Sequence, residues 1–233
     1  MAKPRRSAPV RLSRAQTIAG WCYLPFYLVL LNVLLVAVFR RLEIPITELQ
    51  LNLVYFGLNL LAVLLIFRDF LRQSFFGGSF SNYLETIILG FVFYYAGTWA
   101  VRALLDKLTG GVTIYNNETV ADLVSQSRWV MIAVTVILAP IIEETLLRGL
   151  VFGSIWPASR PMAYLMSILI FTCMHNWQYL GAYPLGSVLL SCIPYLPASA
   201  VLCWTYERGG TIWAPITLHA LINAMSVGLL ALS

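Results

Sequence analysis

Two adjacent glutamates and an arginine lie inside a long apolar run that extends from about Trp129 to Ile155. They are Glu143, Glu144 and Arg148. Ionisable groups at membrane depth are costly, and they usually face the interior of a helix bundle or a water-filled cavity. A carboxylate there can take a proton from water, because the loss of hydration makes it a stronger base. Its chemistry then depends on which other polar groups share its depth.

The two histidines of the chain, His175 and His219, both lie in predicted membrane spans, as does Asn223. A helix rise of about 1.5 Å per residue places Glu143 and Asn223 roughly 18 Å from the inner ends of their helices. The same estimate gives roughly 20 Å for His175 and roughly 12 Å for His219. Groups from three separate spans therefore fall near one layer, as a shared site requires.

The spacing within each helix suggests separate tasks for these residues. Glu144 and Arg148 are four residues apart and can form an ion pair, whereas Glu143 lies about 100° round the helix and can face another partner. His219 and Asn223 share one helix face, where two N–H donors can hold the oxyanion of a tetrahedral intermediate. A carboxylate and a neutral histidine can together activate a water molecule. The residues favour hydrolysis of an acyl bond, such as a peptide bond, within the membrane.

Three alternatives to a hydrolase stay open at this point. The cluster could relay protons in a proton-coupled transporter, but it is compact and does not extend as a chain across the membrane. Glu and His are also zinc ligands; no HExxH motif is present, although ligands from separate helices could assemble a site. The chain could finally be a non-enzymatic membrane immunity or scaffold protein. We expect no metal or other cofactor, with zinc as the alternative.

The composition indicates the fold class. The 233-residue chain is 60% hydrophobic and 11% charged, whereas a soluble domain has about 25% charged residues. The apolar runs are continuous and do not alternate, so helices and not barrel strands span the membrane. We predict an all-α polytopic transmembrane bundle with about seven spans. The predicted spans are residues 18–39, 49–67, 83–105, 129–155, 162–179, 183–206 and 211–232.

The chain divides into three parts: a basic cytoplasmic tail at 1–17, N-terminal spans with a polar loop at 18–128, and a catalytic membrane core at 129–233. The tail contains Lys3, Arg5, Arg6, Arg11 and Arg14. Cytoplasmic segments are rich in Lys and Arg, so we predict a multi-pass protein of the cell membrane with a cytoplasmic N-terminus. A nucleic-acid-binding arm is disfavoured, because the basic run is short and adjoins the first span. The expected partners are membrane lipid and a peptide or protein substrate, but no nucleic acid.

Three motifs in order carry a resemblance to a known family. They are EExxxR at 143–148, preceded by Pro140 and followed by Gly149, then FxxxH at 171–175 and HxxxN at 219–223. In these motifs the chain resembles the CPBP intramembrane proteases. That family includes the type II CAAX prenyl endopeptidases and the bacteriocin-processing and immunity-type membrane proteins. The first three predicted spans show no specific resemblance.

The resemblance implies an intramembrane glutamate-type endopeptidase that needs no metal. Glu143 and His175 would activate the water, and His219 and Asn223 would hold the oxyanion. The catalytic helices would line a cavity open towards the inner side of the membrane.

Glu144 and Arg148 would support the site in this scheme. The identity of the substrate, and whether it carries a lipid, stays open at this stage.

Overall fold

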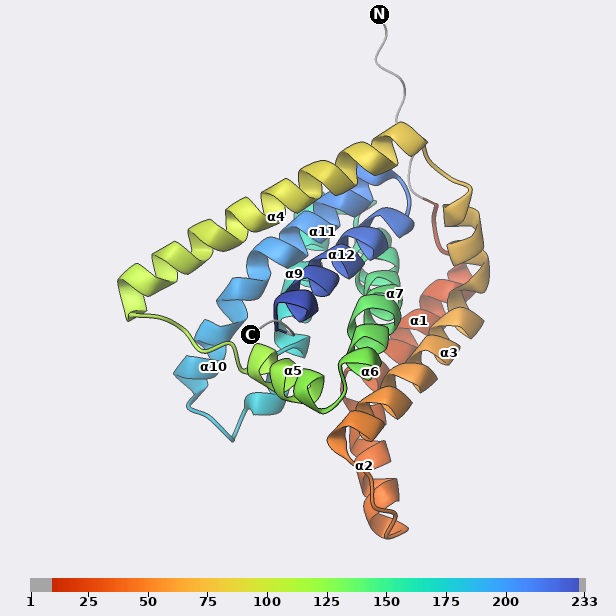
Figure 1. Ribbon diagram of the computed structural model, residues 1–233. Coiled ribbons are helices and arrows are strands. Elements are labelled where there is room, and N and C mark those ends of the chain that lie inside the picture. Colours follow the sequence, from red (N-terminus) through yellow and green to blue (C-terminus); the bar gives the residue numbers. More distant parts are fainter. Residues whose placement is uncertain (1–9, 231–233) are drawn as a thin grey trace, which may run out of the picture.

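The computed structural model describes residues 10–230, which form a bundle of helices without any β-strand (Figure 1). The predicted all-α polytopic bundle is confirmed. Lys3, Arg5 and Arg6 of the predicted basic tail lie outside the described residues, as does the end of the predicted span 211–232.

Five helical stretches within residues 10–230 are long and apolar enough to cross a membrane: Arg14–Arg41, Glu48–Phe75, Phe80–Thr109, Arg128–Ile155 and Leu185–Gly209. Two of these are single α-helices, α3 (Glu48–Phe75) and α4 (Phe80–Thr109). The other three are composite. The first consists of α1 (Arg14–Pro25), η1 (Phe26–Leu30) and α2 (Leu31–Arg41), and the last consists of α10 (Leu185–Cys192), η5 (Ile193–Tyr195) and α11 (Leu196–Gly209). The stretch between them consists of α6 (Arg128–Ile132), η2 (Ala133–Leu138), α7 (Ala139–Glu144), η3 (Thr145–Phe152) and α8 (Gly153–Ile155).

The other helices are α5 (Tyr115–Gln126), α9 (Arg160–Met174), the short turn η4 (Trp177–Tyr179) and α12 (Trp213–Leu230). The predicted spans 162–179 and 211–232 correspond to α9 and α12, which have 15 and 18 residues. At about 1.5 Å per residue, α9 is roughly 22 Å long, which is less than the roughly 30 Å of a bilayer core. His175 therefore caps the end of α9 and does not lie inside a span as predicted.

Side-chain caps fix where the N-terminal helices begin. Ser13 and Gln16 form a reciprocal capping box at α1, and Thr47 and Gln50 form another at α3. Each box satisfies backbone N–H groups that would otherwise lack partners at a helix start.

The segment Ile142–Phe152 lies at the centre of the bundle, and each of its residues is buried. Helices α1 and α3 lie on one side of it, while α9, α11 and α12 lie on the other, with α4 running across the outer face of α11 (Figure 1). Gly90 lets α4 approach closely, because a Cβ there would meet the side chains of Leu218 and Thr205 at 2.6 and 2.9 Å. The two glutamates and the arginine thus lie on the most enclosed helix.

Three segments of the spanning helices are π-helical: η1, η2 and η3. Their N–H groups bond to the carbonyl five residues earlier, and such segments are frequent at functional sites. Proline lies next to two of them, because Pro25 ends α1 and Pro140 follows η2 by two residues. Since proline has no N–H, it leaves a carbonyl of the preceding turn without its helical donor.

Candidate active site

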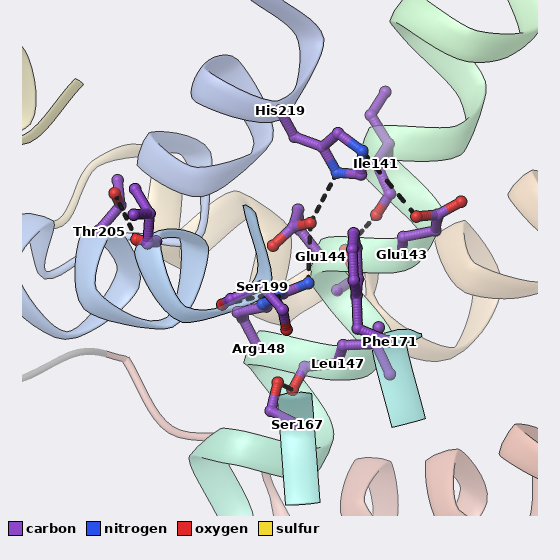
Figure 2. Close-up of polar contacts among 12 residues, drawn as sticks. Ile141, Glu143, Glu144, Leu147, Arg148, Ser167, Phe171, Ser199, Thr205 and His219 are labelled. Carbon is purple, nitrogen blue, oxygen red and sulfur yellow. Dashed lines mark hydrogen bonds and ion pairs between the residues drawn. The ribbon is translucent and has the colours of Figure 1, made fainter. Parts of the chain in front are cut away.

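A buried ion pair anchors the site. Nη1 of Arg148 lies 3.0 Å from Oε1 of Glu144, and both side chains are completely buried. Nη2 of Arg148 donates to the backbone carbonyl and the hydroxyl of Ser199 on α11, at 3.1 and 3.0 Å (Figure 2). The pair expected from the four-residue spacing is therefore formed, and it ties the central helix to α11.

The ring of Phe171 on α9 covers the guanidinium, with Cζ of Arg148 4.7 Å from the ring centroid. Nε of Arg148 has no hydrogen-bond partner in the described part of the chain. The electron-rich ring face attracts the cation and compensates in part for this lost bond. Phe171 thus belongs to the site through a contact that its place in the FxxxH motif does not reveal.

His219 on α12 lies between the two glutamates (Figure 2). Its Nδ1 is 2.7 Å from Oε1 of Glu144, and its Nε2 is 4.0 Å from Oε2 of Glu143. Oε1 of Glu144 also accepts from Arg148, and as an acceptor towards both neighbours it takes its second hydrogen bond from Nδ1–H of His219. Nε2 therefore faces Glu143 at a distance too long for a hydrogen bond.

Glu143 is the glutamate left available for chemistry. Its side chain is only 7% exposed, and Oε2 accepts no hydrogen bond from residues 10–230. The nearest imidazole is that of His219 and not that of His175, which the sequence had paired with Glu143. A buried carboxylate oxygen without a partner is costly, and it commonly marks a position where a ligand or reactant binds.

His175 lies at the end of α9, where its Nδ1 is 2.8 Å from the backbone carbonyl of Phe171. A carbonyl can only accept, so Nδ1 carries the proton and Nε2 of the neutral ring is an acceptor. The ring stacks on Tyr195, with the centroids 4.7 Å apart and the planes at 29°. These contacts fix both the orientation of the ring and the nitrogen that is available to the site.

Asn223 is held by the π-helical segment η2. Its Nδ2 donates to the backbone carbonyl of Thr135 at 2.8 Å. That carbonyl lacks both of its possible helical donors. The N–H of Ala139, four residues later, bonds to the carbonyl of Val134 instead. The residue five positions later is Pro140, which has no N–H. One N–H of the Asn223 amide is therefore used for positioning, and the other stays available.

The four predicted catalytic residues line a single cavity of about 960 Å³. Ligand pockets are typically about 300–1,000 Å³, so this space can hold a short peptide segment. Eight of its lining residues are Phe, Tyr or Trp, and its outer part is polar. Residues of the outer part include Asn32, Glu48, Asn52, Arg102, Asn116, Asn117 and Gln178.

The outer part of the cavity is lined by residues of α2, α3, α4 and α5. Helices α2 and α5 lie at the end of the bundle away from the start of α1 (Figure 1). The sequence predicted a cavity that opens towards the inner side of the membrane and an N-terminus on that same side. These two expectations conflict with each other. The chain enters α1 at one end of the bundle, and the cavity extends towards the other. The two expectations therefore cannot both hold, and the side of the membrane that each end of the bundle faces stays a prediction.

Sequence reasoning missed residues that hold the predicted ones in place. Ser199 binds Arg148, and the carbonyl of Thr135 binds Asn223. Tyr195 stacks on His175. Only Thr135 had a signal in the sequence, because it lies five residues before a proline within an apolar run. The others depend on tertiary contacts.

No group of three or more His, Cys, Asp and Glu residues gathers around one point in the part of the chain that the structure describes. His219 shows the reason, because its two nitrogens face Glu144 and Glu143 in different directions. The absence of a required metal stays a prediction.

The fold and the site together define a multi-pass membrane protein with carboxylates and imidazoles around an internal cavity. Residues 125–225 match the family described as Type II CAAX prenyl endopeptidase Rce1-like. The resemblance seen in the three motifs is thereby confirmed.

Two relatives from the curated proteins cover most of the chain. UPF0177 protein YbdI of Lactococcus lactis subsp. lactis (strain IL1403) is 28% identical over 64% of this chain and 81% of its own length. The protein named "Putative membrane peptidase YdiL" of Bacillus subtilis (strain 168) is 26% identical over 72% of this chain and 66% of its own length. No solved structure gives a significant match.

Proposed function

We propose that this protein is an intramembrane endopeptidase that hydrolyses a peptide bond with a water molecule activated by Glu143. The observation that carries the proposal is the buried Glu143, which lines a cavity of about 960 Å³ and whose Oε2 accepts no hydrogen bond from residues 10–230. His175, His219 and Asn223 line the same cavity. The family match and the peptidase name of the Bacillus relative support the same activity.

In the proposed first step Glu143 takes one proton from water while the water oxygen adds to the carbonyl carbon of the substrate. The π electrons of the carbonyl move to its oxygen, which becomes an oxyanion. Collapse of this intermediate reforms the carbonyl and breaks the C–N bond, and the proton held by Glu143 passes to the leaving nitrogen. Nε2 of His175 is an acceptor that can orient the attacking water.

The oxyanion is held by the free N–H of Asn223 and by Nε2–H of His219. The role of His219 requires a proton on both ring nitrogens, because Nδ1–H is already given to Glu144. In that form the cluster of Glu143, Glu144, Arg148 and His219 carries no net charge, which suits a site inside a membrane. Glu144 and Arg148 orient His219 and do not take part in the bond changes.

The decisive experiment is a proteolysis assay in liposomes with lipidated and unlipidated peptides, run with and without a chelator. Wild type is compared with Glu143→Gln, which keeps the shape of the side chain but accepts a proton poorly. We expect wild type to cleave at least one peptide in chelator and the variant to be inactive although folded. Cleavage by the variant would disprove the role of Glu143, and loss of activity in chelator would establish a metal requirement.

The assay also separates the peptidase from the other candidate functions. A folded wild type that cleaves no member of the panel would favour a non-enzymatic immunity or scaffold protein. A proton flux across the liposome membrane that depends on Glu143 would favour a transporter.

A further inference from the structure

Asn176, the residue after His175, is a buried polar residue that does not line the cavity of the proposed site. It is 1% exposed and lies in the turn that follows α9. Its Nδ2 donates to the backbone carbonyl of Thr172 at 2.9 Å, and its Oδ1 accepts from the hydroxyl of Ser191 on α10 at 2.7 Å. Ser191 is completely buried as well. Both polar atoms of the amide therefore have partners at a depth where an unpartnered one would be costly.

The bond between Asn176 and Ser191 connects the two segments that carry the stacked rings of the site. The bonded residues are 15 positions apart in the chain. Asn176 directly follows His175, and Ser191 lies four residues before Tyr195, where α10 continues into η5. The rings of His175 and Tyr195 stack with their centroids 4.7 Å apart. The same two segments are thus joined twice, once through buried polar atoms and once through ring faces.

The chain between the two bonded residues has few buried contacts of its own. Among residues 177–190 only Val188 is buried. Segments with few buried contacts have little local stability. The buried bond between Asn176 and Ser191 therefore closes the base of this segment, and it fixes how the end of α9 lies against η5.

The amide of Asn176 also completes the end of α9. The last carbonyls of a helix have no helical donors. Two side chains that follow α9 supply them: Nδ1 of His175 donates to Phe171 at 2.8 Å, and Nδ2 of Asn176 donates to Thr172 at 2.9 Å. Consecutive side chains thus bond to consecutive carbonyls, so a shift of Asn176 would move the turn that orients the ring of His175.

We propose that Asn176 and Ser191 are positioning residues, which hold the backbone at His175 so that its ring stays stacked on Tyr195 and its Nε2 stays in place to orient the attacking water. The inference rests on the proposed peptidase function. Neither Asn176 nor Ser191 lines the cavity, so both act on the reaction through His175. No bond of the substrate forms or breaks on them.

The test is Ser191→Ala, which leaves Oδ1 of Asn176 buried without its donor. A misplacement of about 1 Å that originates far from the chemistry can cost about 10² in rate. We therefore expect kcat to fall on the order of 10²-fold, with KM near that of wild type. Equal kcat in Ser191→Ala and wild type would overturn the inference.

Thr211→Val is the matched control. The Thr211 hydroxyl donates to the backbone carbonyl of Ser74 at 2.6 Å, both residues are buried, and neither lines the cavity. Both variants should lower the melting temperature, but the control should leave kcat near that of wild type. An equal loss of kcat in the two variants would mean that stability and not positioning is responsible.

The same substitution in a His175→Phe background separates positioning from a general loss of structure. Ser191→Ala should cause no further fall in kcat there, because no acceptor nitrogen is left to position. A fall by the same factor in both backgrounds would overturn the inference, since Ser191 would then act independently of His175.

A last measurement does not depend on activity. Diethyl pyrocarbonate modifies unprotonated imidazole nitrogens, and mass spectrometry gives the rate at His175 with His219 as the internal reference. We expect faster modification of His175 in Ser191→Ala, because the ring is released from its stack, and an unchanged rate in Thr211→Val. An unchanged rate in Ser191→Ala would overturn the inference. Failure of wild type to cleave any peptide would instead count against the proposed function alone.

Discussion

Nδ1 of His219 lies 2.7 Å from Oε1 of Glu144, the glutamate that follows the proposed base. One carboxylate therefore orients the imidazole while its neighbour in the chain stays free, and the EE pair divides into a positioning residue and a reactive one. Arg148 makes this division stable, because it holds the same oxygen of Glu144 from the other side.

Arg148→Ala should destabilise the protein strongly. It leaves the carboxylate of Glu144 buried without its cation, and breaking a buried pair in this way costs about 3–5 kcal/mol. The measurement is the melting temperature in detergent, followed by the fluorescence of the tryptophans. Arg160→Ala is the control, because the Arg160 side chain is 63% exposed in its ion pair with Glu207. Equal stability of the two variants would contradict the structural role of Arg148.

Ser199→Ala should have a smaller effect than Arg148→Ala. The variant loses the hydroxyl that binds Nη2 of Arg148, but the backbone carbonyl of residue 199 still accepts from the same atom. A single hydrogen bond to a charged group contributes about 1.5–3 kcal/mol. We expect an intermediate melting temperature and retained peptide hydrolysis. A melting temperature as low as that of Arg148→Ala would mean that the hydroxyl is the main anchor.

Asn223→Asp should abolish hydrolysis although it preserves the size of the side chain. An ionised carboxylate would place an oxygen against the carbonyl of Thr135, where the amide now donates at 2.8 Å. It would also present no N–H to the oxyanion, which costs about 10²–10³ in kcat. Ser226→Ala on the same helix is the control, because its hydroxyl bonds only to the carbonyl of Ile222. Activity of Asn223→Asp near that of wild type would exclude Asn223 as a donor.

His175→Phe should keep the ring stack on Tyr195 but remove the acceptor nitrogen. We expect a folded protein whose kcat is lower by about 10²–10⁴, the range attributed to general acid–base groups. Tyr195→Phe should retain the stack and the activity, since only its ring contacts His175. If His175→Phe hydrolyses peptides at the wild-type rate, the base acts without His175.

Asn117 and Pro157 should lie on opposite sides of the membrane. Asn117 borders the outer part of the cavity, whereas Pro157 follows α8 near the end where the chain enters α1. The test labels Asn117→Cys and Pro157→Cys with a membrane-impermeant maleimide after the exposed Cys22 and Cys173 are replaced by serine.

With a cytoplasmic N-terminus, only Asn117→Cys should react in intact cells. Reaction of Pro157→Cys alone would reverse the orientation, and reaction of both would contradict the bundle.

The sequence predicted the all-α bundle, the Glu144–Arg148 pair and the residues that meet at the cavity. These features depend on hydropathy, on helix spacing and on the rarity of ionisable groups in apolar runs, all of which are local properties of the chain. Local patterns also located the polar loop, in which the structure has the helix α5 (Tyr115–Gln126).

The remaining features depend on tertiary contacts that no local pattern contains. The length of α9 was overestimated because the apolar pattern continues past Met174, whereas the helix ends there and His175 becomes its cap. The preference of Glu143 for His219 over His175 follows from how α12 and α9 pack against the central helix. The direction of the cavity was inferred from the resemblance, and it stays a prediction.

The π-helical segment η2 makes the number of residues before Glu143 a structural constraint. Each residue turns an α-helix by about 100°. A one-residue deletion within 133–138 that restored regular α geometry would therefore rotate the part of the helix before the deletion by that angle relative to Glu143. Thr135 would then turn its carbonyl away from Asn223, without any change to the motifs themselves. Members of the family that differ by such a deletion would keep EExxxR, FxxxH and HxxxN but need another way to orient the asparagine.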